Sequence, residues 1–224
     1  MPTVPVTYFS DLLCLWAYIA QLRLDALRDR FADQIVIESR FCSVFGDTAG
    51  KIPAAWRDRG GYEGFNAHLR ESAARFPEVR FNPDIWLAVR PASSNGAHLA
   101  LTAIRLAEAA GACEPGACDR ATWALRRAFF EQARDVGRWE VQRDVFREAG
   151  LDPAVLEAFV HDGTAFAALA ADYRAAEGLR IQGSPSLVLN GGRQILYGNL
   201  GFRIIEANIQ ELLRDPDPNQ ASWC

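Results

Sequence analysis

The β-strand patterns of this 224-residue chain lie near its two ends, and a long stretch of helical pattern separates them. Apolar–polar alternation marks the strands, and apolar residues at i, i+3 and i+4 mark the helices. The outer elements expected are a strand over 4–9, a helix over 14–31, a strand over 35–44, a strand over 186–189, a turn at Asn190-Gly191-Gly192, a strand over 193–197 and a helix over 202–213. Short strands must share a sheet to bury an apolar face, so we expect the two ends to fold together.

The middle of the chain is then an insertion into that sheet unit. Its expected elements are a helical stretch over 53–76 broken at Gly60-Gly61, an irregular segment over 78–91, and helices over 93–110, 120–136, 141–149 and 153–177, the last broken near Gly163. We therefore predict an α/β fold of order βαβ … ββα with a large all-helical insertion. Residues 1–50 and 178–214 would form the sheet domain, residues 51–177 the insertion and residues 215–224 a tail.

Charge and hydropathy exclude several kinds of partner. The formal net charge is −4 and the chain has no Lys/Arg block, so nucleic acid is not an expected partner. No apolar run approaches the length of a membrane-spanning helix, so no membrane partner is expected. The N-terminus lacks a basic start followed by an apolar run, which predicts a cytoplasmic protein.

The five cysteines are an odd number at irregular spacings. This argues against a disulfide framework and favours a reducing compartment. Cys42 lies in a strand and is expected in the core. Cys113 and Cys118 are expected to be a pair of loop thiols, with a disulfide or half a metal site as alternatives; the three histidines show no supporting spacing, so no metal is expected. Cys224 is expected to be a terminal thiol, with a folded-back resolving thiol as the alternative.

Cys14 is the strongest candidate for chemistry. A thiol in the first turn of a helix faces backbone N–H groups and the positive end of the helix dipole, which lower its pKa. Its apolar neighbours would raise the pKa if the thiol were buried, so function requires an exposed Cys14. The alternative is a packed cysteine at a strand–helix junction. Ala17 stands three residues later, so the two positions cannot form a disulfide; Asp11 would cap the helix or disfavour the thiolate.

Ser184-Pro185 is the second candidate, because a proline enters the late strand there. A cis bond would turn the backbone groups of Ser184 outward, ready to pair with an extended thiol-bearing peptide. An ordinary trans proline in a loop is the alternative, and the sequence does not separate the two.

The chain resembles the DsbA-like branch of the thioredoxin superfamily, in particular its FrnE-type members and the 2-hydroxychromene-2-carboxylate isomerases. The segments that carry the resemblance are Tyr8-Phe9-Ser10-Asp11, Cys14-Leu-Trp-Ala17-Tyr18, Gly183-Ser-Pro-Ser and Asn190-Gly191. The resemblance covers essentially the whole chain and implies a thioredoxin-like fold. It also implies that Cys14 is the attacking group and that Pro185 is a cis-proline facing it.

The sequence departs from these relatives at the site itself. Redox members of the family carry Cys-Pro-x-Cys; here Leu15 replaces the proline and Ala17 replaces the second cysteine. These two replacements weaken the interpretation of the chain as a dithiol oxidase. Isomerases and kappa-class glutathione transferases usually carry serine where this chain has Cys14. The Asp-Arg pair that binds the glutathione γ-glutamyl end in those relatives is missing from residues 197–201.

Three functions follow. The first is a thiol–disulfide oxidoreductase or isomerase that uses one active-site cysteine, with glutathione as resolving co-substrate and no tightly bound cofactor. The second is a glutathione-dependent isomerase or transferase acting on a small aromatic molecule, and the third is a non-catalytic peptide-binding or chaperone-like protein. The expected catalytic residues are Cys14, Ser184 and Pro185, and the expected substrate-binding residues are Ser10, Trp16, Ala17, Trp86 and Asn95. Apolar surface on the insertion would allow a homodimer.

Overall fold

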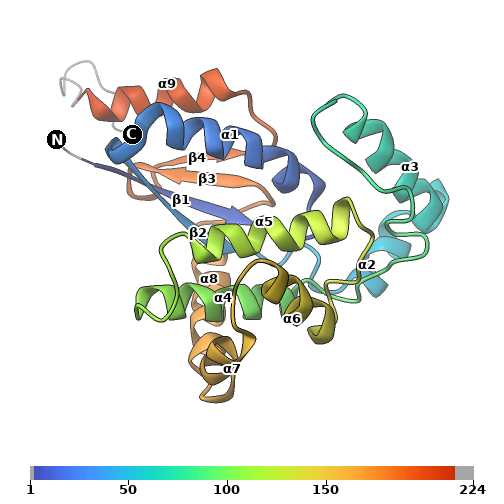
Figure 1. Ribbon diagram of the computed structural model, residues 1–224. Helices are drawn as coiled ribbons and strands as arrows, with labels where there is room; N and C mark the ends of the chain where they lie inside the picture. Colours follow the sequence, from blue (N-terminus) through green and yellow to red (C-terminus); the bar gives the residue numbers. More distant parts are fainter. Residues whose placement is uncertain (1–2, 215–224) are drawn as a thin grey trace.

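The strands from the two ends of the chain meet in one four-stranded sheet of order β2-β1-β3-β4 (Figure 1). The computed structural model describes residues 3–214. β1 (Val4–Ser10) pairs in parallel with β2 (Ile35–Phe41) and antiparallel with β3 (Ser186–Leu189), which pairs antiparallel with β4 (Gln194–Tyr197). The predicted βαβ … ββα order around a helical insertion is confirmed. Residues 215–224, predicted to be a tail, lie outside the described residues, and Cys224 is among them.

Two helices, α1 (Leu15–Phe31) and α9 (Phe202–Leu213), lie together on one face of the sheet (Figure 1). One face of α1 carries Leu24, Leu27 and Phe31 into the core that α9 and the sheet complete. Alternation along β1 supplies Val6 and Tyr8 to the same core. This side of the fold is thus a two-layer unit built only from the ends of the chain.

The insertion packs on the other side and holds the largest apolar core. Its helices are α2 (Thr48–Ala55), α3 (Gly61–Ala73), α4 (Asn95–Ala109), α5 (Ala117–Phe130), α6 (Trp139–Glu148), α7 (Pro153–His161) and α8 (Thr164–Gly178). Leu12 and Leu13, from the turn before α1, are buried in that core. The core of the insertion therefore includes the segment that leads to Cys14, and the division predicted at residues 50 and 51 falls inside α2.

Several boundaries differ from the sequence prediction for local reasons. The second strand ends at Phe41 instead of residue 44, because the backbone N–H groups of Val44 and Phe45 donate to the Asp11 carboxylate. Cys118 lies in the first turn of α5 and not in a loop. The break predicted near Gly163 is confirmed: the stretch over 153–177 is two helices, and the Gly163 φ of 84° is a conformation that glycine adopts readily.

Side chains from the insertion cover the outer edge of β2. The Arg105 guanidinium donates to the Ser39 carbonyl (2.7 Å) and pairs with the Asp172 carboxylate (2.9 Å). That carboxylate accepts the backbone N–H of Phe41 (3.3 Å). Two of the backbone groups that a further strand would use, the Ser39 carbonyl and the Phe41 N–H, are thus already occupied.

Within residues 3–214, no single helix has the length and apolar composition needed to cross a membrane. α7 and α8 meet those requirements only as a pair, and they are bent by 76° at their junction. Over the same residues, no group of three or more His, Cys, Asp or Glu side chains is placed to hold a metal ion.

Two leucines of α1 test how this helix packs. Leu27 is fully buried, whereas Leu22 is 44% exposed. We expect Leu27→Ala to lower the free energy of unfolding by about 2–5 kcal/mol through lost apolar contact and a residual cavity. Leu22→Ala should change it by no more than about 0.5 kcal/mol. Urea unfolding followed by circular dichroism measures both, and equal losses would contradict the packing of α1 described above.

Candidate active site around Cys14

Cys14 lies in the connection between β1 and α1. A turn brings the Cys14 N–H to the Asp11 carbonyl (3.2 Å), and Cys14 adopts an extended conformation as the residue before the helix. Its own carbonyl accepts from the N–H groups of Ala17 (3.1 Å) and Tyr18 (3.0 Å), which starts the helix. The predicted placement of this thiol at a helix start is therefore correct.

The Ser184–Pro185 peptide bond is cis and faces Cys14. The Cys14 thiol donates to the Ser184 carbonyl (3.2 Å), and the Ser184 hydroxyl accepts the N–H of Asp11 (2.8 Å). The Ser184 carbonyl thus points inward to the cysteine, and not outward as the sequence interpretation supposed. The turn at Asp11 and the strand entry at Pro185 are joined at two points, although they lie far apart in the chain.

The thiol of Cys14 is closed off from solvent. Only 6% of the residue is exposed, so the expectation of an exposed thiol with a lowered pKa is wrong. Burial is the main reason that the pKa of Cys14 is raised; contacts with Ser184 and with the Ala17 amide offset part of this, and the charge of Asp11 adds to it. Leu13 and Leu15 are also buried and help to cover this region. The resting thiol is protonated at neutral pH.

The carboxylate of Asp11 fixes the turn that carries Cys14. It is fully buried and accepts four hydrogen bonds, from the N–H groups of Leu13 (2.9 Å), Val44 (2.9 Å) and Phe45 (2.8 Å) and from the Ser94 hydroxyl (2.9 Å). These donors come from the turn itself, from the segment after β2 and from the start of α4. Four donors on one carboxylate join these three segments to one another. The Ser94 side chain therefore binds Asp11 and does not cap α4.

A second chain of hydrogen bonds runs from the turn to the surface. The N–H of Leu12 donates to Nε2 of His98 (3.0 Å), which leaves the ring proton on Nδ1, facing the Tyr173 hydroxyl (2.9 Å). That hydroxyl donates to the side-chain oxygen of Asn95 (2.8 Å). Burial lowers the pKa of His98, so the ring is neutral. The exposed Asn95 is thereby linked to the residue two positions before Cys14.

Arg126 of α5 is a buried cation beneath the same site. Its guanidinium donates to the Ser10 hydroxyl (3.0 Å) and to the Gln21 side-chain oxygen (3.3 Å). In the described part of the chain it has no carboxylate within 4.0 Å. The positive charge of Arg126 partly counteracts the burial that raises the pKa of Tyr8 to about 12. A buried cation that rests on neutral oxygens holds α5 against β1 and α1.

Three of the five predicted substrate-binding residues are inaccessible, which corrects the sequence interpretation. The hydroxyl of Ser10 is used by Arg126, and Ala17 lies fully buried within α1. Trp86 is fully buried because it packs against aromatic rings from the insertion and from the segment after β2. Those rings belong to Phe45, Phe65 and Phe129. None of these three side chains has surface to offer a substrate.

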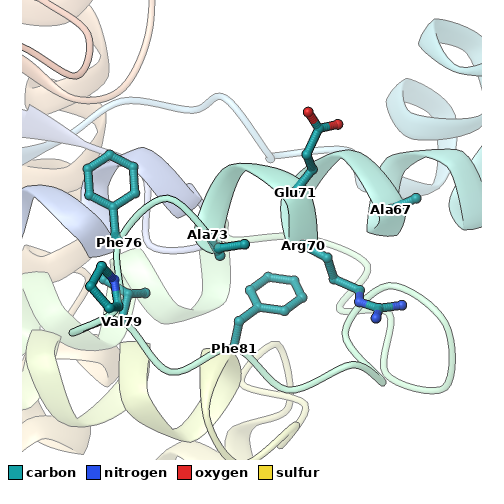
Figure 2. A pocket seen from close by; sticks show the side chains of 9 residues that line it. Ala67, Arg70, Glu71, Ala73, Phe76, Val79 and Phe81 are labelled. Atoms are coloured by element: carbon teal, nitrogen blue, oxygen red, sulfur yellow. The ribbon is translucent and has the colours of Figure 1, made fainter.

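Trp16 and Asn95 do have solvent-accessible surface that a substrate could contact. Trp16 is partly exposed and meets Phe76 edge to face, with ring centroids 6.2 Å apart. Phe76 lines a pocket of about 630 Å³ between α3 and the segment that follows it (Figure 2). Figure 2 shows the ring of Phe81 below α3, with Arg70 and Glu71 on opposite sides of the helix. The partly apolar pocket is thus linked through one aromatic contact to the helix that Cys14 starts.

Sequence reasoning missed the polar residues of the insertion that support the turn. His98 and Arg126 each stand on a helix face that is otherwise apolar, beside Leu101 and Phe129 respectively. A polar side chain in such a position must find a buried partner, and this was the available signal. The partner itself was not visible, because it lies on β1 or the following turn.

The chain belongs to the DSBA-like thioredoxin domain family, whose model matches residues 5–210. Among solved structures, it is similar to a candidate protein disulfide isomerase from Nitrosomonas europaea, with 13% identity, a TM-score of 0.78 and coverage of 96% of this chain and 100% of that one. It is similar to the cytosolic disulfide reductase DsbM from Pseudomonas aeruginosa, with 18% identity, a TM-score of 0.65 and coverage of 95% and 100%.

A 2-hydroxychromene-2-carboxylate isomerase is also similar, with 17% identity, a TM-score of 0.63 and coverage of 94% and 97%. The comparison with curated proteins finds no match. The predicted thioredoxin-like fold is confirmed. Identities this low carry the fold alone, so the activity has to be argued from the residues of the site.

The Asp11 carboxylate can be tested against a surface aspartate. Asp11→Ala leaves four donors without their acceptor, each at about 1–3 kcal/mol, so we expect a loss on the order of 4 kcal/mol or more in unfolding free energy. Asp152 accepts one exposed N–H, from Ala154, and Asp152→Ala should cost about 1 kcal/mol. Urea unfolding measures the difference; a loss at Asp11 no larger than that at Asp152 would show that its carboxylate does not fix the turn.

The pH dependence of Cys14 alkylation tests the closed thiol. A raised pKa gives a smaller thiolate fraction at every pH below it, and burial slows access further. We expect iodoacetamide to modify Cys14 slowly at pH 7, with a rate that still rises above pH 9. In urea the alkylation rate of the same cysteine should level off once the pH exceeds the usual cysteine pKa of about 8.5. Peptide mass spectrometry measures both, and a native thiol that reacts as fast at pH 7 as the unfolded one would contradict the structure.

Proposed function

We propose that this chain is a thiol–disulfide oxidoreductase or isomerase that attacks disulfides through Cys14, with an external thiol such as glutathione returning the protein to its reduced state. One observation carries the proposal: the Cys14 thiol starts α1 and hydrogen-bonds to the Ser184 carbonyl beside the cis Pro185. A disulfide-bearing peptide that pairs with the Ser184 segment would bring its sulfur next to that thiol.

The burial of Cys14 determines how the reaction begins. The thiol donates a hydrogen bond to the Ser184 carbonyl and has almost no exposed surface. A partner must therefore first open the turn over residues 11–14. Water then reaches the sulfur, the burial that raises its pKa is relieved, and the proton leaves to solvent. The thiolate attacks one sulfur of the partner disulfide, forming a mixed disulfide and releasing the other sulfur as a thiolate.

Glutathione is the proposed external thiol. Ala17 supplies no second sulfur within α1, so a thiol from elsewhere must act on the mixed disulfide. The DsbM relative from Pseudomonas aeruginosa, described as a cytosolic disulfide reductase, has been solved with GSH. We propose the same cytoplasmic setting and the same class of thiol here, with no tightly bound cofactor.

Two observations favour other functions. The raised pKa and burial of Cys14 favour a peptide-binding protein that has lost catalysis together with the second cysteine. The pocket beside Phe76 and Phe81 favours a small aromatic substrate, as in a glutathione-dependent isomerase or transferase. That pocket is not lined by Cys14, which ranks this function below thiol exchange.

Replacement of the thiol tests the proposal. We expect the wild-type chain, incubated with glutathione disulfide at pH 8, to be oxidised at Cys14 and to speed reduction of a disulfide peptide by glutathione. Cys14→Ser should lose both activities. Cys118→Ser is the matched control, because Cys118 is also buried, and it should keep both. Mass spectrometry and peptide chromatography measure the two outcomes.

Peptide reduction that is unchanged in Cys14→Ser would overturn the proposal. Peptide binding that survives in Cys14→Ser, with Cys14 left as a free thiol in the wild-type chain, would instead support the binding protein. Saturable glutathione binding together with turnover of an aromatic substrate would support the isomerase or transferase.

A further inference from the structure

A second cysteine, Cys42, lies at the same edge of the sheet as Cys14. Ser10 and Phe41 are the last register partners of β1 and β2, and the two strands are parallel. The next residue after Phe41 is Cys42, whose N–H donates to the Ser10 carbonyl (3.2 Å). Parallel strands end at a common edge, so the turn that carries Cys14 and the segment that begins with Cys42 leave the sheet side by side.

The Asp11 carboxylate ties these two segments together. It accepts N–H groups from Leu13 on one side and from Val44 and Phe45 on the other. The two thiols also influence each other. Burial first, and then the negative charges of Asp11 and of an ionised Cys14, raise the pKa of Cys42 to about 12.

Cys42 also has an opening of its own. It lines a pocket of about 330 Å³ with Lys51, Tyr173 and Gly183, and Gly183 directly precedes the Ser184 carbonyl that Cys14 contacts. The Lys51 ammonium offsets a small part of the burial that raises the pKa of Cys42. The pocket therefore gives this thiol space and a nearby cation, next to the segment that holds Cys14.

The other described thiols lack this arrangement. Cys118 is as buried as Cys42, and its pKa is likewise raised to about 12, but its Sγ approaches the Leu101 carbonyl (3.5 Å) inside the insertion. Cys113 lines a separate pocket with Gly111 and Gly150. Among the cysteines of residues 3–214, only Cys42 begins a segment that leaves the sheet beside the Cys14 turn and that the Asp11 carboxylate joins to that turn.

We propose that Cys42 is the resolving thiol of Cys14, taking the role that a cysteine at position 17 would otherwise fill. This rests on the function proposed above and adds a step to it. After Cys14 has formed a mixed disulfide with the partner, the Cys42 thiol loses its proton to solvent and the resulting thiolate attacks the Cys14 sulfur. The partner sulfur leaves as a thiolate and takes up a proton, and a Cys14–Cys42 disulfide forms.

The electrons balance across the cycle. Two protein thiols lose two electrons, and the partner disulfide gains them to become two thiols. Two molecules of glutathione then reduce the Cys14–Cys42 disulfide and leave as glutathione disulfide. Cys42 thus releases the partner before glutathione acts on the protein.

Formation of the Cys14–Cys42 disulfide requires Cys14 to move, and the structure provides a reason for that movement. A disulfide needs Cα atoms about 4.4–6.8 Å apart, and both cysteines are free thiols in the resting fold. Cys14 is held by the hydrogen bond from its thiol to Ser184. A sulfur in a mixed disulfide has no hydrogen to donate, so that bond is lost at the first step. The Cys14 side chain then loses this restraint, while the Asp11 carboxylate still holds the turn beside the segment after β2.

Trapping with glutathione disulfide tests the inference. The wild-type chain, Cys42→Ser and the matched Cys118→Ser are each incubated with glutathione disulfide at pH 8, quenched with acid, and mapped by mass spectrometry without reduction. We expect a Cys14–Cys42 disulfide in the wild-type chain and in Cys118→Ser. In Cys42→Ser we expect that disulfide to be lost and the Cys14–glutathione adduct to accumulate in its place.

The alternative outcomes separate this inference from the proposed function. Equal glutathione adducts at Cys14 in all three proteins, with no Cys14–Cys42 linkage, would overturn the role of Cys42 and leave thiol exchange at Cys14 intact. No adduct and no linkage in any of them would overturn the proposed function as well. Circular dichroism spectra of the three proteins confirm that the comparison is between folded chains.

Discussion

One buried carboxylate, that of Asp11, joins the parts of this molecule on which the site depends. It gathers donors from the turn before α1, from the segment after β2 and from the start of α4. A buried charge is tolerated only when such donors satisfy it, so the three segments and the carboxylate depend on one another. The sheet unit and the insertion are therefore joined directly beside Cys14 by hydrogen bonds that would be costly to lose, and not by apolar contacts alone.

The same arrangement explains why the thiol is closed. Asp11 and Ser184 hold the turn against the strand entry at Pro185, and the neighbouring leucines are drawn into the core of the insertion. The interactions that position Cys14 also remove it from water and keep it protonated. The structure that places the Cys14 thiol precisely thus also lowers its reactivity. A partner that binds at Ser184 has to supply the free energy that opens the turn.

Much of the fold followed from the sequence, because local patterns decide local structure. Alternation over residues 4–9 and the Asn190-Gly191 turn were enough to predict the outer strands, and Ala17 was enough to exclude a Cys-x-x-Cys disulfide. Burial of Cys14 could not be predicted, since its thiol packs against the Ser184 carbonyl, which lies 170 residues away in the chain. The contacts of Asp11 were equally hidden, because their donors are backbone groups that no residue type reveals.

The side chains along β2 have a consequence for how this protein behaves in a crowded solution. An open sheet edge is a template on which another chain can add a strand and start to aggregate. Arg105 and Asp172 bond to the Ser39 carbonyl and the Phe41 N–H of that edge, so two of the groups that a second molecule would need are already occupied. The opposite edge belongs to β4, which spans only four residues and offers a short template. An ion pair between two helices thereby makes one end of the β2 edge less suited to strand addition.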